Sequence, residues 1–294
     1  MSTGDGSATA GLPGDSAAAY CESLVREHDK DRYLATLFAP AEKRRHLYAL
    51  YAFNYSVART REVVSDPTIG EIRLQWWRDT LDGIWRGVTP EDPVAIELAR
   101  AIEAGGLTRL GFMGLLEART FDLYDDPMPS VDVLEGYLGE TSSSLIQMAS
   151  LILSPDRGAL AANAAGHAGV AYGITGLLRA LPLHRARGQC YVPVSLLARH
   201  GITAAHVLSG RNGEAIAVTL REMRLLARRH LMEARERGGA LPEEVLPAFL
   251  PVSVCDLYLK RLERLGARAM KRVADVSQIR RQWRMLWYAM NGRF

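Results

Sequence analysis

The sequence predicts an all-α protein of one domain, with roughly ten helices packed around one core. Three observations support this class. Apolar residues recur with helical spacing along most of the 294 residues, and no segment sustains the alternation that is typical of a strand. Prolines and glycines fall mainly between these apolar segments. The composition, 48% hydrophobic and 23% charged, is that of an ordinary globular protein and argues against disorder.

The first half of the chain shows clear helix starts after a short tail. Residues 1–15 predict a disordered N-terminal tail, and the domain is expected to span 16–294. Ser16 is a suitable N-cap, and Pro40 and Pro93 stand where first-turn prolines open helices. The helices predicted in this half cover residues 17–28, 40–64, 71–85, 93–105 and 112–124.

Two further helices are predicted in the middle of the chain. Residues 131–153 predict one long helix, with Ser130 as its N-cap and Pro155 just beyond its end. Residues 158–178 have no formal charge and consist mainly of alanine and glycine. Because these two residue types contribute little transfer free energy, a buried central helix is favoured over a membrane span.

The last part of the chain begins with a connection at residues 182–193, in which only QCYV resembles a strand. Beyond it, the pattern predicts helices at 213–237, 243–265 and 275–290. Pro247 and Pro251 should kink the second of these helices, because proline removes a backbone hydrogen bond and its ring clashes with the preceding turn.

Charge is distributed unevenly along the chain. Residues 1–198 have 18 basic and 24 acidic residues, a net charge of −6, whereas residues 199–294 have 18 basic and 9 acidic residues, a net charge of +9. The C-terminal third should therefore face an anionic group, such as a diphosphate, a membrane surface or an acidic partner. The total of +3 does not indicate a nucleic-acid partner. Cys21, Cys190 and Cys255 lack zinc spacing, which favours core thiols in a reducing, cytoplasmic environment.

One group of acids has a composition that could bind Mg²⁺. Asp122, Asp125 and Asp126 lie close together just before Pro127. Mg²⁺ sites usually combine one or two carboxylates with substrate phosphates. Such acids at the end of a helix are nevertheless usually exposed, and a solvated helix end is the favoured interpretation of this group.

Tyrosines give the helix predicted at 40–64 an unusual face. Tyr48, Tyr51 and Tyr55 lie on it. Aromatic faces can stabilise carbocations by cation–π interaction. Core tyrosines whose hydroxyl groups are hydrogen-bonded are the more common alternative, and the residues themselves leave both interpretations open.

Two segments resemble the signature helices of the squalene/phytoene synthase family. They are YALYAFNYSVARTREVV, at residues 48–64, and GITGLLRALPLHRARGQCYVP, at residues 173–193, and the resemblance extends over about residues 20–280. It implies the isoprenoid synthase fold, a helical bundle around a central cavity. Family enzymes join two prenyl diphosphates head to head, with Mg²⁺ held between two aspartate-rich helices.

The aspartates of those two helices are mostly missing here. The family's acidic positions fall on Ala58, Arg59 and Glu62 in the first segment and on Ala180 and His184 in the second, so only Glu62 is acidic. A cluster of Mg²⁺ ions needs several carboxylates, and Arg59 would repel it. Ionisation of a diphosphate would then lose most of its charge stabilisation. We therefore expect no catalytic residues, no metal site and no cofactor.

The second segment is most similar to a divergent branch of the family, related to the mitochondrial complex I assembly factor and its alphaproteobacterial counterparts. This resemblance implies a non-catalytic, membrane-associated factor for respiratory complex assembly that retains a cavity for a prenyl or other lipid ligand. The alternative is an active head-to-head prenyl diphosphate transferase that binds Mg²⁺ through unorthodox ligands. The residues expected at the cavity are Tyr48, Tyr51, Tyr55, Glu62, Tyr172, Arg179 and Tyr191.

The C-terminal third also contains segments rich in basic residues and tryptophan, a composition typical of helices that lie in a membrane surface. Basic residues at Lys260, Arg264, Arg268 and Lys271 follow helical spacing, and Trp283 and Trp287 are i, i+4 neighbours among arginines. These residues predict reversible binding to an anionic membrane, with the protein cytoplasmic and peripheral on the inner membrane. An ordinary solvated face over a core that contains tryptophan is an equally good interpretation of the same pattern.

Overall fold

The computed structural model describes residues 14–294, and all regular secondary structure within this range is helical. The predicted tail, residues 1–15, lies outside the described residues except for Gly14 and Asp15, which begin the first helix. The segment QCYV, predicted as the only strand-like piece, forms no strand, although the main-chain NH of Met128 donates to the carbonyl of Cys190. The single-domain boundary at 16–294 stays a prediction.

Ten helices of the described chain have ten or more residues, in agreement with the predicted number, and short helices or turns connect them. The α-helices are α1 (Gly14–His28), α2 (Lys30–Thr36), α3 (Ala41–Ala58), α4 (Thr60–Val63), α5 (Pro67–Trp85), α6 (Pro93–Gly105), α7 (Arg109–Thr120), α8 (Val131–Leu138), α9 (Ser144–Leu153), α10 (Ala162–Ala186), α11 (Val194–Arg199), α12 (Ala204–Ser209), α13 (Gly213–Arg237), α14 (Leu246–Phe249), α15 (Cys255–Leu265) and α16 (Gln278–Met290).

Helix α6 illustrates how local sequence sets the boundaries. The Asp92 carboxylate accepts hydrogen bonds from the main-chain NH groups of Val94 and Ala95, and Pro93 occupies the first turn. Gly106, with φ 57°, ends the helix in the left-handed conformation that glycine adopts without steric strain. The predicted range, 93–105, is confirmed.

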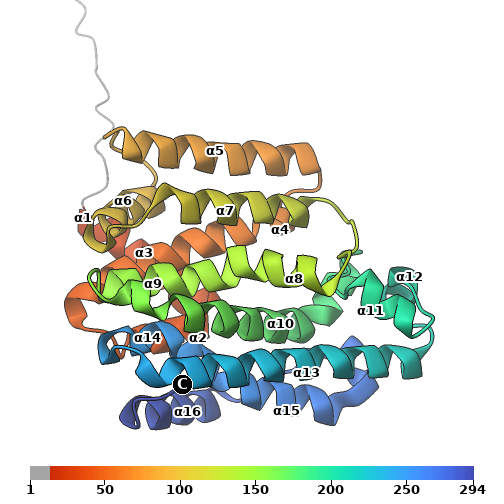
Figure 1. Ribbon diagram of the computed structural model, residues 1–294. Coiled ribbons are helices and arrows are strands. Elements are labelled where there is room, and N and C mark those ends of the chain that lie inside the picture. The colour runs from red at the N-terminus through yellow and green to blue at the C-terminus, as the bar shows by residue number, and fades with distance from the viewer. Residues whose placement is uncertain (1–13) are drawn as a thin grey trace, which may run out of the picture.

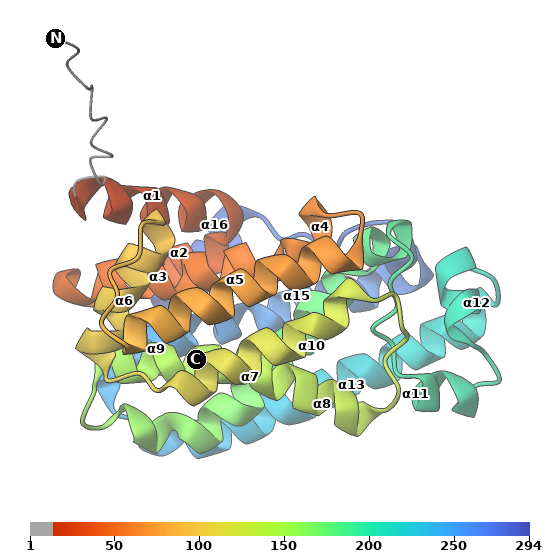
Figure 2. The same ribbon diagram turned by 90° about the horizontal axis from the view of Figure 1, so that it is seen from above.

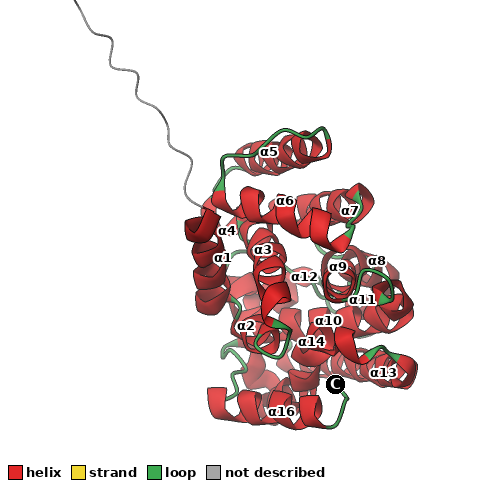
Figure 3. Cartoon of the chain, turned by 90° about the vertical axis from the view of Figure 1, so that its left-hand side faces the viewer, coloured by secondary structure: helices red, strands yellow, loops and turns green. Residues whose placement is uncertain are grey.

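The long helices lie in layers that Figure 1 shows from top to bottom, with α5 at one edge and α15 and α16 at the other. Figure 2, seen from above, and Figure 3, seen nearly along the helix axes, show α10 in the interior of the bundle. Its two halves contribute to different apolar clusters, with Ala164 and Ala168 in one and Ile174 and Leu178 in the other. The two larger apolar clusters thus meet along α10, and a small third cluster of Val254, Tyr258 and Met285 lies beneath α16, where one core was predicted.

The helix predicted at 131–153 is confirmed over that whole range, although its hydrogen-bonding pattern changes in the middle. A π-helical turn, Gly139–Ser143, separates α8 from α9. This turn packs closely on α10, where the hydroxyl of Ser143 donates to the carbonyl of Gly166 at 2.7 Å. A Cβ atom at Gly169 would lie only 2.3 Å from the main-chain nitrogen of Ser143. The small residues of the uncharged segment thus permit this close approach, and the predicted buried central helix is confirmed.

Replacing Gly169 tests this contact. We expect Gly169→Ala to destabilise the protein by about 1–3 kcal/mol, because backbone has to move to accommodate the methyl group. Gly166→Ala is the matched control on the same helix, since a Cβ atom there meets nothing within 4 Å. The control should be neutral or slightly stabilising, because alanine favours helix. Equal thermal unfolding midpoints for the two variants would show that the close contact does not constrain α10.

Other predicted boundaries were wrong in ways that tertiary contacts explain. Helix α10 continues through Pro182 to Ala186, and the Arg185 side chain anchors its end to the carbonyls of Met270 and Leu208. The helix predicted at 243–265 is broken into 3₁₀ turns, α14 and α15 around its two prolines, and α3 and α4 divide the one predicted at 40–64. The short helices α2, α11 and α12 were not predicted.

Among the described residues, no helix has both the length and the apolar content that crossing a bilayer requires. The three cysteines are free and buried, as predicted for core thiols.

Candidate functional site

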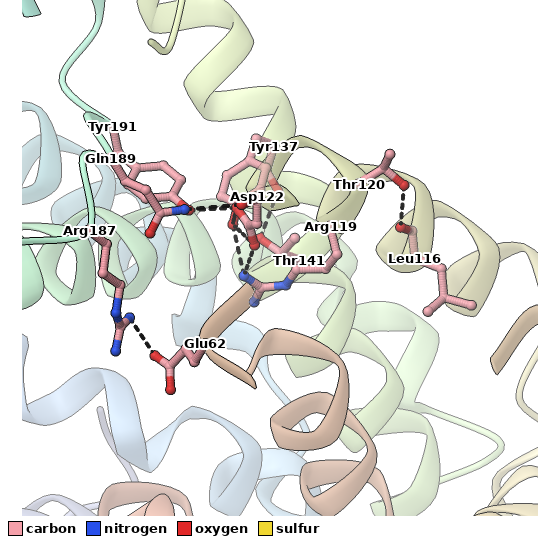
Figure 4. Close-up of polar contacts among 10 residues, drawn as sticks. All are labelled: Glu62, Leu116, Arg119, Thr120, Asp122, Tyr137, Thr141, Arg187, Gln189 and Tyr191. Atoms are coloured by element: carbon pink, nitrogen blue, oxygen red, sulfur yellow. Dashed lines mark hydrogen bonds and ion pairs between the residues drawn. The ribbon is translucent and has the colours of Figure 1, made fainter. Parts of the chain in front are cut away.

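The five positions that correspond to family acids lie near the ends of α3 and α10. Ala58 ends α3, Arg59 follows it, and Glu62 lies in α4. Figure 4 shows that Glu62 points to Arg187, just beyond α10, whose Nη1 lies 2.7 Å from the Glu62 Oε1. The Arg59 guanidinium lies 5.3 Å from the centre of the Tyr55 ring. The one remaining acid is therefore already neutralised by an arginine of the opposite segment.

His184 adds no negative charge to this region. Its ring centre lies 4.7 Å from that of Tyr191, and burial lowers the pKa of His184 to about 4. The imidazole is consequently neutral near pH 7, where a family enzyme has a carboxylate. Ala180 on the same helix offers no ligand at all.

Next to His184 lies Asp122, a buried acid that the sequence placed in a solvated group with Asp125 and Asp126. Asp122 is only 6% exposed and accepts hydrogen bonds from Tyr191 at 2.7 Å, Tyr137 at 2.9 Å and Arg119 at 2.9 Å. Its main-chain carbonyl accepts from the Gln189 amide (Figure 4). Burial raises the pKa of both phenols, which therefore keep the protons that they donate.

The favoured interpretation of Asp122, Asp125 and Asp126 as one solvated helix end is thus wrong for Asp122. The other two acids are exposed, and Asp125 pairs with Arg61 at 3.1 Å. Asp122 differs because the segment after α10 folds back over the end of α7 and places Tyr191 beside it. Arg119 lies only three residues before Asp122, but Tyr137 and Tyr191 lie 15 and 69 residues after it, so local spacing could not have revealed these two donors.

The interior tyrosines surround a buried arginine. The Arg32 guanidinium lies 5.5 Å from the ring centre of Tyr51 and 5.0 Å from that of Tyr172, and it donates to Asp29 at 2.7 Å. Tyr48 is buried and stacks on Tyr33 instead. The structure therefore brings Tyr51 and Tyr172 together, with α2, an unpredicted helix, supplying the cation between them. The ligand cavity at these residues stays a prediction.

Arg179 belongs to a second buried ionic cluster. Asp31, 4% exposed, accepts from Arg281 at 2.8 Å and from the Tyr258 hydroxyl at 3.0 Å. The Arg179 guanidinium lies 3.6 Å from the Tyr258 ring centre, and its Nη1 lies 3.8 Å from the Asp31 carboxylate. Segments from both ends of the chain and from α10 meet here, so that Arg179 has partners within the protein.

The residues present do not fit a cluster of Mg²⁺ ions. Of the five family positions, four lack a carboxylate, and Glu62 is paired with Arg187. Elsewhere in the described chain, no three His, Cys, Asp or Glu side chains converge on a common metal position. His167 and His230 approach within 3.0 Å through their Nδ1 atoms, but Glu135 contacts the opposite nitrogen of His230.

The residues predicted to face a membrane are all exposed, namely Lys260, Arg264, Arg268, Lys271, Trp283 and Trp287. The four basic residues do not share one helix, however. Helix α15 ends at Leu265, and Gly266, with φ 52°, leads into a 3₁₀ turn that carries Arg268. Lys260 and Arg264 thus remain neighbours on α15, whereas Arg268 and Lys271 lie beyond its end.

The helical bundle and its site define the class of protein: an all-α protein with the isoprenoid synthase fold, in which most of the metal-binding acids are absent. Residues 25–287 match the family model described as Squalene/phytoene synthase, and the chain belongs to this family. It is 33% identical to bovine NADH dehydrogenase (ubiquinone) complex I, assembly factor 6, over 88% of this chain and 77% of the relative, and 27% identical to 15-cis-phytoene synthase of Synechocystis, over 74% and 67%.

Solved structures agree with this assignment at the level of the fold. A dehydrosqualene synthase in complex with ligand superposes with a TM-score of 0.77 at 21% identity, covering 93% of this chain and 95% of the other. A squalene synthase from Alicyclobacillus acidocaldarius gives a TM-score of 0.74 at 20% identity, covering 87% and 97%. The predicted all-α isoprenoid synthase fold is confirmed.

Proposed function

We propose that this protein is a non-catalytic factor in the assembly of respiratory complex I and binds peripherally to the inner membrane from the cytoplasmic side. The observation that carries the proposal is the loss of a carboxylate at four of the five family positions, with the fifth, Glu62, paired to Arg187. Relatives named complex I assembly factor 6 support the same role. Its partners would be assembly intermediates of the complex.

A lipid ligand is the second part of this proposal. The faces of Tyr51 and Tyr172 would contact a prenyl or other lipid chain, and Arg32 would face its polar end. Such a ligand would be bound without being converted, because no metal ion would be held beside it to ionise a diphosphate. Assembly, rather than synthesis, is therefore the function that the site supports best.

Deleting the gene in its own organism tests the assembly role. We expect NADH:quinone oxidoreductase activity to fall in isolated membranes and to return with a wild-type copy. A Glu62→Gln copy should restore it equally well, because an exposed ion pair contributes at most about 1 kcal/mol and no metal depends on this acid. Rescue by the wild type but not by Glu62→Gln would favour the metal-dependent transferase. Unchanged activity after deletion would refute the assembly role.

A further inference from the structure

Helix α16 carries a row of apolar side chains on its outer surface. Its inner face buries Arg281 and Met285, whereas the opposite face is open to solvent along the whole helix. The exposed residues of this outer row are Ile279 (66%), Trp283 (67%), Leu286 (39%), Trp287 (54%) and Met290 (78%). Their spacing places them on one side of the helix, and contiguous apolar surfaces of this kind mark interaction sites. Figures 1 and 3 show α16 at the edge of the bundle.

A basic groove lies beside this row. A cavity of about 350 Å³ between α15 and the start of α16 is lined by Lys260, Arg261, Arg264 and Arg280, with Asp275 as the one carboxylate in its lining. Within the described chain, none of these four cations forms an ion pair, and the Nε of Arg261 is buried without a hydrogen-bond partner. Arg261 thus offers one unsatisfied buried donor, and four cations beside one carboxylate leave the groove with unbalanced positive charge.

The other arginines of α16 show that this imbalance is local. Arg281 pairs with Asp31 at 2.8 Å, and Arg284 pairs with Asp256 at 2.9 Å, both on the inner side of the helix. The basic residues of α16 therefore form two groups. Arg281 and Arg284 point inward and hold the helix on the bundle, whereas Arg280 points outward and faces the groove. Only the outward one is free to bind an anion.

We propose that α16 lies in the surface of an anionic bilayer, with its apolar row among the lipid chains and a lipid phosphate in the basic groove. This inference rests on the peripheral membrane association proposed above and assigns it a surface. Tryptophans beside arginines on a solvent-facing helix suit the boundary between lipid headgroups and acyl chains. An acidic protein surface could neutralise the positive charge of the groove. It would not provide apolar surroundings for the five exposed apolar side chains of the outer row, whereas a bilayer provides both.

The opposite edge of the molecule supplies a matched control. Helix α5 also exposes apolar residues, namely Ile69, Ile72 and Trp76. Glu71 and Asp79 are exposed on the same helix and offset its positive charges. If exposed apolar side chains were sufficient for membrane binding, both α5 and α16 would bind a bilayer. If the basic groove is needed as well as the apolar row, only α16 would bind.

Vesicle co-sedimentation with the full chain tests the groove. Vesicles of phosphatidylcholine are compared with vesicles that also contain phosphatidylglycerol, at low and at high salt. Lys260→Glu/Arg264→Glu/Arg280→Glu should weaken binding to the anionic vesicles by at least about 100-fold. Arg73→Glu/Arg86→Glu/Arg211→Glu changes the net charge equally at exposed positions elsewhere and should bind nearly as wild type does. An equal loss in both variants would overturn the groove assignment.

Quenching of tryptophan fluorescence by brominated lipid tests the apolar row. Wild type and Ile69→Ser/Ile72→Ser/Trp76→Ser should be quenched alike on anionic vesicles, whereas Ile279→Ser/Trp283→Ser/Met290→Ser should lose most of the quenching. Retained quenching in the α16 variant would refute insertion of this helix. If the wild-type protein does not bind anionic vesicles even at low salt, the inference is overturned, and an acidic protein becomes the candidate partner for the groove. Complex I rescue is measured separately, so failure here leaves the assembly role standing.

Discussion

Incubated with farnesyl or geranylgeranyl diphosphate and Mg²⁺, the protein is expected to release no squalene, phytoene or cyclopropyl diphosphate intermediate. The physical reason is charge. Ionising a prenyl diphosphate needs cations beside the leaving group, and several kcal/mol of such stabilisation correspond to a rate at least about 10³-fold higher. Ala58, Arg59, Ala180 and His184 provide no carboxylate to hold those cations, and Glu62 is engaged by Arg187.

The measurement is extraction and chromatographic separation of radiolabelled products, with an active phytoene synthase assayed in parallel as the control. Binding should be measured in the same samples, because the proposed lipid ligand can be held without turnover. Product formed at a rate typical of enzymes would refute the non-catalytic assignment and establish the transferase with unorthodox ligands. Membership of the family would be unaffected by either result.

Asp31→Asn is expected to produce the largest loss of stability, about 3–5 kcal/mol. The substitution leaves the buried Arg281 and the half-buried Arg179 without their counter-charge while preserving the size of the side chain. When one member of a buried ion pair is removed, the other charge remains buried without a partner. Its desolvation then lowers the free energy of unfolding, because water cannot reach and screen that charge. The same change weakens the link between α16 and α2, because Arg281 of α16 pairs with Asp31 of α2.

Urea unfolding measures this effect, and Asp125→Asn is the matched control. Asp125 also pairs with one arginine, Arg61, but half of its side chain is exposed, so its loss should change the free energy of unfolding by no more than about 1 kcal/mol. If Asp31→Asn unfolds within about 0.5 kcal/mol of wild type, the cluster is not a determinant of stability.

The sequence by itself determined the helical class, most of the long helices and the family. The helices are readable because they depend on local spacing: apolar periodicity predicts a helix, and Asp92, Pro93 and Gly106 bound α6 without help from distant residues. The family was inferred from the resemblance of residues 48–64 and 173–193 to its signature segments. The loss of metal-binding acids follows from the same resemblance, which assigns the family's acidic positions to five residues of this chain, only one of them acidic.

Only the tertiary structure decided which polar residues act together. Asp31 and Arg281 are 250 positions apart, and Asp122 and Tyr191 are 69 apart, so their pairing depends on how the helices pack. The same holds for α16, where packing turns Arg281 inward and leaves Trp283 and Arg280 outside, although all three belong to one basic, aromatic pattern. Spacing along a helix determines which residues share a face. The packing of the helix on the rest of the protein determines whether that face contacts other charged side chains, water or lipid.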